Sequence, residues 1–251
     1  MSEKIADDEW EWYIGKLYAK LIEKVHVGNL ETVVELALGY RYKIAYALKE
    51  FNFKGNLYVI DTNKEVLEYI KEMYTKFLPE ANIICINKNF ENCFDNIPNE
   101  FDLFLSNHSI DDMIIVEYME KSYINNLGKD DFRDILSEAW KELGKDTNMI
   151  ENITNDVYLS FKRFFDNKKI ETIIMSQYKS NLYFKEEFKE MDEITENCFN
   201  KIKQLVNMDN DYINKVLEYY PFGEDDERYN GKYLLDNTQN AKNWIVGSDL
   251  C

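Results

Sequence analysis

Residues 32–61, TVVELALGYRYKIAYALKEFNFKGNLYVID, decide the fold prediction for this chain. An apolar run that leads into Glu35 is followed by a turn at Gly39, a helical segment and a second apolar run that ends at Asp61. An open parallel sheet holds an adenosine-containing cofactor with this order of strand, loop, helix and strand-terminal carboxylate. The stretch therefore indicates a reaction class, although it names no substrate.

Apolar runs and helical segments continue to alternate beyond this stretch. The runs are apolar without strict alternation and are separated by helical segments, which favours a parallel sheet buried on both faces over a sheet of hairpins. The first helical segment carries apolar side chains at steps of three and four, as an amphipathic helix does. The predicted strands are 33–38, 56–61, 81–87 and 101–107, and the predicted helices are 8–25, 42–51 and 64–78.

A long helical stretch, residues 111–167, precedes the fifth predicted strand at 169–178. A crossover between parallel strands needs only about a dozen residues, so we expect an inserted helical cap here. A second helical region, 186–220, leads to two short apolar runs at 232–237 and 243–250, which are joined by a polar turn. Their close spacing predicts an antiparallel hairpin at the end of the sheet.

These segments predict an α/β fold with a Rossmann-like, mostly parallel, seven-stranded sheet and a terminal antiparallel hairpin. An N-terminal helix and a helical insertion between the fourth and fifth strands complete it. The predicted domains are a helical lid at 1–26, a cofactor-binding domain at 27–110 and 168–251, and a helical cap at 111–167.

Composition narrows the class of protein. The chain has 251 residues, of which 45% are hydrophobic, and a net charge of −17 with no basic block, so nucleic acid is not an expected partner. No apolar run approaches the length of a membrane span, and the acidic N-terminus does not look like a secretory signal, so we expect a cytoplasmic protein. Four scattered cysteines indicate neither a disulfide framework nor a zinc site.

The strand order, the ELALG loop that begins at Glu35, and Asp61 at the end of the second strand resemble class I S-adenosylmethionine-dependent methyltransferases. The resemblance implies S-adenosylmethionine as cofactor, with methionine-end contacts at Glu35, Ala37 and Gly39. It also implies ribose contacts at Asp61, beside Thr62. Without the family, a glycine still allows close approach of a ligand, and a carboxylate still accepts two hydroxyl protons.

Arg41 departs from the family pattern, which has a small residue at this position. Its long cationic side chain either fills part of the pocket or pairs with the cofactor carboxylate, and the sequence leaves both alternatives open. An ordinary strand-to-helix turn in an unrelated α/β protein is the plain alternative for the whole loop.

The ends of the third and fourth strands supply further candidates. The amide of Asn89 is placed to accept a proton from an adenine amine, and Phe90 to lie along the ring. The loop after the fourth strand is expected to face the transferable group, with His108 as a general base and Asp111 or Asp112 orienting it or binding a substrate cation. The two aspartates are equally suited to begin the next helix. The further cofactor candidates here are Ser106 and Asn107.

The sequence thus predicts a methyltransferase that acts on an oxygen or nitrogen atom of a small organic molecule or peptide, without a metal. Two alternatives remain: a non-catalytic binding or partner protein that kept the fold, and another user of S-adenosylmethionine. An NAD-dependent dehydrogenase is a more distant alternative, because the loop lacks GxGxxG.

Overall fold

The computed structural model describes residues 2–26, 28–36, 39–121, 132–179, 189–208, 213, 217 and 238–249. Within these residues, seven strands form one sheet in the order β3-β2-β1-β4-β5-β7-β6. Strands β1 to β5 are parallel, and β7 is antiparallel to both β5 and β6. The predicted fold class is confirmed.

The elements are α1 (Ser2–Val25), β1 (Thr32–Leu36), α2 (Lys43–Glu50), β2 (Asn56–Asp61), α3 (Lys64–Phe77), β3 (Asn82–Asn87), η1 (Phe90–Asn92), η2 (Phe94–Asn96), β4 (Glu100–Asn107), α4 (Ile110–Lys121), α5 (Phe132–Gly144), α6 (Thr147–Asn167), β5 (Lys169–Ser176), α7 (Lys189–Lys203), β6 (Val206–Met208), η4 (Ala241–Asn243) and β7 (Trp244–Asp249).

The C-terminal strands differ from the prediction in one respect. Helix α7 ends at Lys203, and β6 follows inside the region 186–220 that the sequence predicts as helical. The described antiparallel partners of β7 are β5 and β6, while the predicted strand 232–237 lies outside the described residues. A strand of three residues is too short to show an alternating pattern. The helical prediction therefore continues through β6 from the helix before it.

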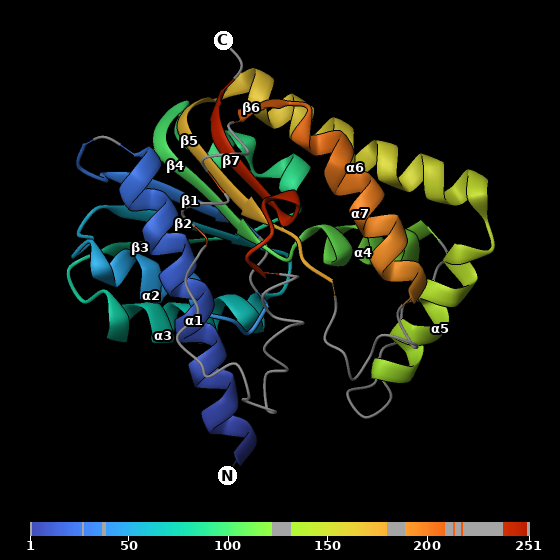
Figure 1. Cartoon of the computed structure of the whole chain (residues 1–251), viewed down its shortest axis with the longest axis horizontal. Helices are drawn as coiled ribbons and strands as arrows, with labels where there is room; N and C mark the ends of the chain where they lie inside the picture. Colours follow the sequence, from blue (N-terminus) through green and yellow to red (C-terminus); the bar gives the residue numbers. More distant parts are fainter. Residues whose placement is uncertain are drawn as a thin grey trace.

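Helices cover both faces of the sheet, as Figure 1 shows: α1, α2 and α3 lie on one side and α4 to α7 on the other. Strand β1 explains why both faces are apolar. Val33 belongs to the core under α1 to α3, whereas Val34 and Leu36 belong to the core under α4 to α7. Side chains alternate between faces along a strand, so a strand covered on both sides is apolar throughout.

Helix α1 is part of the first core and also lies close to α2. Tyr13, Leu17 and Leu21 are fully buried in that core. Gly15 allows the close approach, because a Cβ there would lie 2.6 Å from the carbonyl oxygen of Lys43. The start of α2 is thereby fixed against α1, next to the loop that follows β1.

The strand order reverses between β1 and β4, which are neighbours in the sheet. Ligands of open α/β sheets bind at such a reversal, outside the carboxyl ends of the strands. The loops after β1, β2, β4 and β5 therefore frame the candidate site. None of the described helices combines the length and the apolar character needed to cross a bilayer.

Candidate functional site

The loop after β1 meets the end of β2 at Gly39 and Asp61. Gly39 has a φ of +54°, and its N–H points to Oδ2 of Asp61 at 3.4 Å. The other carboxylate oxygen, Oδ1, accepts from the N–H of Asn63 at 2.8 Å. No heavy atom of the described residues beyond its chain neighbours lies within 4 Å of the place a Cβ on Gly39 would occupy. Gly39 and Asp61, which the sequence predicts as separate cofactor contacts, are adjacent, with open space over the glycine.

Glu35 is directed into the first core instead of toward this loop. The Tyr74 hydroxyl lies 3.0 and 2.8 Å from its two carboxylate oxygens, and only 3% of Glu35 is exposed. Burial raises the pKa of Glu35 well above its ordinary value, against the Tyr74 hydrogen bond and with help from the nearby Glu11 carboxylate. The predicted contact of Glu35 with a cofactor ammonium finds no support in this arrangement. Ala37 lies outside the described residues.

Arg41 is held by α1. Its Nη1 lies 3.4 Å from Oε1 of Glu11, and the backbone N–H of Tyr42 donates to Oε2 of the same carboxylate at 2.9 Å. The side chain of Glu11 is almost fully buried, whereas half of that of Arg41 is exposed. This partner is neither of the two alternatives that the sequence leaves open, because the arginine binds a carboxylate of the chain itself.

The end of β3 supports the end of β2. Asn87 donates from Nδ2 to the carbonyl oxygens of Asp61 and Thr62, at 3.2 and 2.8 Å. Asn89 is exposed before η1, while Phe90 is buried and packs on Phe104, Phe161 and Phe164 in the second core. Phe90 is thus a core residue in this structure.

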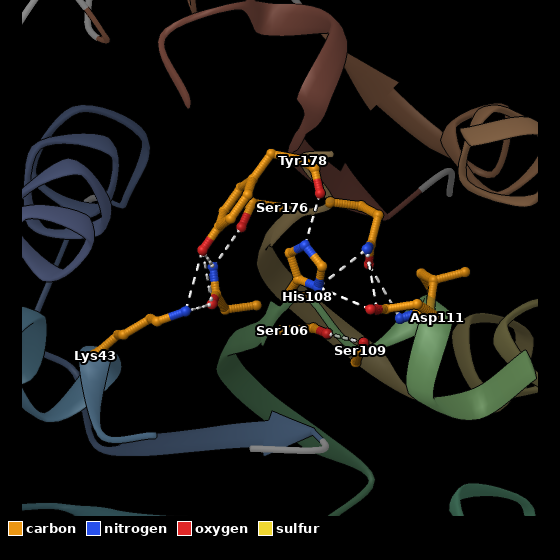
Figure 2. Close-up of polar contacts among 10 residues, drawn as sticks. Lys43, Ser106, His108, Ser109, Asp111, Ser176 and Tyr178 are labelled. Atoms are coloured by element: carbon orange, nitrogen blue, oxygen red, sulfur yellow. Dashed lines mark hydrogen bonds and ion pairs between the residues drawn. The ribbon is translucent and has the colours of Figure 1, made fainter. Parts of the chain in front are cut away.

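His108 lies at the centre of a polar network between the ends of β4 and β5 (Figure 2). Its Nδ1 lies 3.0 Å from Oδ2 of Asp111, and its Nε2 lies 2.6 Å from the carbonyl oxygen of Tyr178. These two partners are acceptors, so both ring nitrogens act as donors, which is the pattern of an imidazolium. The Gln177 amide nitrogen also lies near Nδ1, at the longer distance of 3.3 Å. Burial by itself lowers the pKa of His108, but the Asp111 carboxylate outweighs burial and raises it to about 9.

The backbone of His108 is also unusual, with a φ of +57°. A non-glycine residue in this region costs about 1 kcal/mol or more and persists where its surroundings fix it. Here the N–H of His108 donates to the carbonyl oxygen of Ser176 at 2.8 Å, in addition to the two ring contacts. The network therefore holds the loop after β4 against the end of β5.

Asp111 and Asp112 begin α4 and have different environments. Asp111 is buried and accepts from Nε2 of Gln177 at 3.0 Å, and the neighbouring His108 keeps its pKa below the ordinary value despite burial. Asp112 is exposed. The surrounding chain atoms remove part of the hydration of this carboxyl. This loss and the neighbouring Asp111 carboxylate raise the pKa of Asp112 to about 7. Asp112 is the accessible carboxyl of the pair.

Asn107 connects this network to α2. Its Oδ1 accepts from Nζ of Lys43 at 2.7 Å, and its Nδ2 donates to Oγ of Ser176 at 2.7 Å. The ammonium of Lys43 also donates to the Tyr178 hydroxyl at 3.1 Å. Ser106 is buried; its hydroxyl contacts that of Ser109, and its carbonyl oxygen accepts from Tyr18. Both predicted residues are present in the network, with every one of these bonds made to the chain itself.

Sequence reasoning missed Lys43, Ser176, Gln177 and Tyr178. Ser176 ends β5 and the other two follow it, whereas the sequence prediction placed candidate residues only at the carboxyl ends of the first four strands. Lys43 had a weaker signal: a lysine in the first turn of a helix opposes the helix dipole, which indicates a local partner. No group of three or more His, Cys, Asp or Glu residues in the described ranges is arranged to hold a metal ion.

Neither the scan against protein-family models nor the search of curated proteins found a match. Solved structures do align with the chain. One is an S-adenosylmethionine-dependent methyltransferase from Clostridium acetobutylicum ATCC 824, with 17% identity, a TM-score of 0.40, and coverage of 68% of this chain and 51% of that one. The chain therefore spans about half the length of that protein.

Two further solved structures have similar scores. The plantazolicin methyltransferase BpumL in complex with SAH shares 10% identity over 98% of this chain and 88% of that one, with a TM-score of 0.46. A putative rRNA methylase from Clostridium thermocellum shares 12% identity over 67% of this chain and 72% of that one, with a TM-score of 0.37. Similarity at this level concerns the fold alone.

Proposed function

We propose that this protein is an S-adenosylmethionine-dependent methyltransferase acting on an oxygen or nitrogen atom of a small organic molecule or peptide. The observation that carries the proposal is the contact of Gly39 with Asp61 at the reversal of the strand order, with open space over the glycine. A cofactor with a ribose and a charged tail matches a carboxylate and an open loop at this place.

The residues present fit such a cofactor in part. Each Asp61 oxygen accepts one hydrogen bond from the described residues and keeps a further lone pair for a hydroxyl proton. Gly39, Asp61 and Thr62 are the residues that would hold the cofactor, and Arg41 leaves the loop toward Glu11. Glu35 does not fit, because its carboxylate is bound by Tyr74. When bound, S-adenosylmethionine supplies an electrophilic methyl group on a sulfonium.

The side chains of the loop after β4 would position the acceptor and receive its proton. His108 donates from both nitrogens, so we assign it a positioning role instead of the predicted role of general base. Asp112, exposed and with a pKa of about 7, is the group suited to accept a proton near neutral pH. Asp111 keeps His108 charged and oriented. We further propose that α1 and α4 to α6 act as the predicted lid and cap that exclude water.

Titration calorimetry with S-adenosylmethionine and with S-adenosylhomocysteine tests cofactor binding. We expect dissociation constants on the order of micromolar for the unchanged protein, and at least about tenfold weaker binding for Asp61→Ala, since a carboxylate that binds two hydroxyls is lost. Asp166→Ala, which removes an exposed carboxylate on α6, is the control and should bind normally. Absence of heat with both compounds would refute the proposal.

The burial of Glu35 favours one alternative, a binding protein that kept the fold without turnover. The two readings differ in product formation, because only an enzyme converts S-adenosylmethionine when an acceptor is present. A screen for S-adenosylhomocysteine release with small molecules, peptides and RNA as acceptors separates them. Release with RNA alone would overturn the acceptor class, which rests on the acidic charge of the chain.

A further inference from the structure

Lys43, the first residue of α2, is a buried lysine whose hydrogen-bond partners are neutral. Only 8% of the residue is exposed, and its ammonium donates to Oδ1 of Asn107 at 2.7 Å. It also donates to the Tyr178 hydroxyl at 3.1 Å, toward which the side chain points in Figure 2. An ammonium has three N–H donors, so one donor of Lys43 has no acceptor among the described residues.

Lys168 shows how another buried lysine of this protein is satisfied. Lys168 is 7% exposed, and its ammonium donates to the carbonyl oxygens of Phe94 and Ile97 at 2.7 and 3.0 Å. A third bond goes to Oδ1 of Asn99 at 3.2 Å. All three of its donors therefore have acceptors in the chain, as expected of a lysine that only supports the fold. Lys43, in contrast, retains a donor for a ligand.

The charge of Lys43 also lacks a counter-ion among the described residues. Arg41 is paired with Glu11, and His108 is paired with Asp111. No described carboxylate forms an ion pair with Lys43, and the first turn of α2 carries no acidic side chain. A buried cation is costly without an opposite charge, and a helix N-terminus adds positive potential. The position therefore favours an anionic group of a ligand, and a carboxylate suits the remaining N–H donor.

Asn107, which holds this ammonium, occupies the position on β4 that Asp61 occupies on β2. Strand β1 lies between these two strands, and its Leu36 pairs with Ile60 on one side and with Ser106 on the other. Asp61 and Asn107 are the next residues on the two strands. Neighbouring strands are about 4.8 Å apart, so these two positions are about 10 Å apart across the end of β1.

The side chains of Asp61 and Asn107 point to the same face of the sheet. Val59 and Leu105, two residues earlier on the same strands, both belong to the core under α1 to α3, and residues two apart on a strand share a face. Six single bonds separate the ribose ring of S-adenosylmethionine from its carboxyl carbon, a chain of about 7 Å when extended. With a hydrogen bond at each end, a cofactor whose ribose binds Asp61 would reach Lys43.

We propose that Lys43 binds a carboxylate in the candidate site, and that the spacing assigns this carboxylate to the tail of the cofactor. The assignment to the cofactor rests on the proposed methyltransferase function. A carboxylate of the methyl acceptor is the other source of the same chemistry, because Asn107 ends β4 and Tyr178 lies just after β5, beside His108. Binding measurements separate the two sources without turnover.

The first experiment compares S-adenosylhomocysteine with its decarboxylated form by titration calorimetry. Lys43→Met removes the ammonium and keeps the length of the side chain. We expect Lys43→Met to weaken S-adenosylhomocysteine about ten- to hundredfold, as for a lost hydrogen bond between charged groups, and to change the decarboxylated form less than about twofold. Lys168→Met, at the lysine with three acceptors, is the control and should bind both compounds as the unchanged protein does.

Thermal unfolding without ligand distinguishes a ligand-binding lysine from a structural one. Lys43→Met keeps Oδ1 of Asn107 at 3.4 Å from the Tyr178 hydroxyl and removes a buried charge without a counter-ion, so the midpoint should stay equal or rise. Lys168→Met removes the donor of three acceptors and should unfold earlier. If Lys43→Met unfolds as early as Lys168→Met and weakens both nucleosides equally, Lys43 is structural and the proposal is wrong.

Amide chemical shifts test the acceptor as the source, with benzoate and benzamide as probes in the presence of S-adenosylhomocysteine. The acceptor is the source if Lys43→Met leaves both nucleosides unaffected but abolishes shifts at residues 43, 107 and 178 that benzoate, and not benzamide, causes. Unaffected nucleosides together with no benzoate shift would overturn the proposal. If neither nucleoside binds the unchanged protein, the methyltransferase proposal fails, and benzoate alone decides whether Lys43 binds a carboxylate.

Discussion

The ion pair of His108 and Asp111 should make the stability of this protein depend on pH in the alkaline range. The pKa of His108, about 9 in the folded chain, exceeds the ordinary histidine value of about 6.5. This difference corresponds to at most about 3 kcal/mol of stabilisation. Because the folded pKa is the higher one, the contribution is complete below about pH 6.5 and disappears as the pH rises through about 9. The lowered pKa of Asp111 makes its side of the same interaction disappear in acid, as the pH falls below about 4.

His108→Asn tests this directly, because asparagine tolerates the positive φ of this position while removing the cation. We expect the variant to be less stable by about 2–3 kcal/mol near pH 6, and the difference to shrink toward zero near pH 10. Urea unfolding monitored at several pH values measures both numbers. Asp111→Asn and the double variant complete the cycle, and the double variant should lose little beyond either single change.

A difference between the two proteins that stays constant from about pH 6 to about pH 10 would refute the reasoning, because a structural role of the ring carries no such pH dependence. Nitrogen chemical shifts give an independent reading. They should show an imidazolium at His108 near neutral pH, and a neutral ring there would contradict the two donor contacts.

Two further predictions concern the first loop and its strand. Gly39→Ala should cost about 1 kcal/mol in thermal unfolding, because an alanine is strained at a φ of +54°. It should also weaken cofactor binding in calorimetry, because its methyl group enters the open space over the loop. Unchanged values for both would contradict this reading. Glu35→Gln should raise the free energy of unfolding near pH 8, because a carboxyl whose pKa is raised by folding destabilises the protein above its ordinary pKa, while glutamine keeps an acceptor for Tyr74. The gain should fade as the pH falls below the ordinary pKa of a glutamate. Denaturant titrations near pH 8 and below that pKa check it.

The sheet could be predicted from sequence because its central strands are buried on both faces. Residues 56–61 are an example: the predicted strand and β2 have the same ends. Asp61 and Gly39 could be assigned to one site because parallel pairing brings the ends of β1 and β2 together. Strand β6 could not be predicted, since three residues carry no period and its register depends on β7, about forty residues later.

The contacts of individual site residues were harder to predict than the elements that carry them. Glu35 was correctly placed in its strand, but its partner Tyr74 lies 39 residues later on α3 and marks no motif. The Lys43 ammonium reaches Tyr178 across 135 residues, from a helix start to a strand end that only the folded sheet brings together. Periodicity predicts which face of an element is buried, but it does not predict which polar side chains meet there.

In the sequence, the long cationic side chain of Arg41 is the strongest indication against cofactor binding. The structure weakens this indication, because α1 supplies a partner for the arginine. Glu11 is an acid on the buried side of α1, and its two oxygens hold both Arg41 and the backbone of Tyr42. The Arg41 cation is thus paired with a carboxylate of the chain, and the Lys43 ammonium is hydrogen-bonded to the amide oxygen of Asn107. With these two cations and His108 each bound to an acceptor of the chain, Asp61 and Asp112 provide the negative charge available to a cationic cofactor. Under the proposed function, we therefore expect electrostatic selection of the cofactor to depend on Asp61 and on Asp112 at the start of α4, and not on Glu35, to which the family resemblance assigns a cofactor contact.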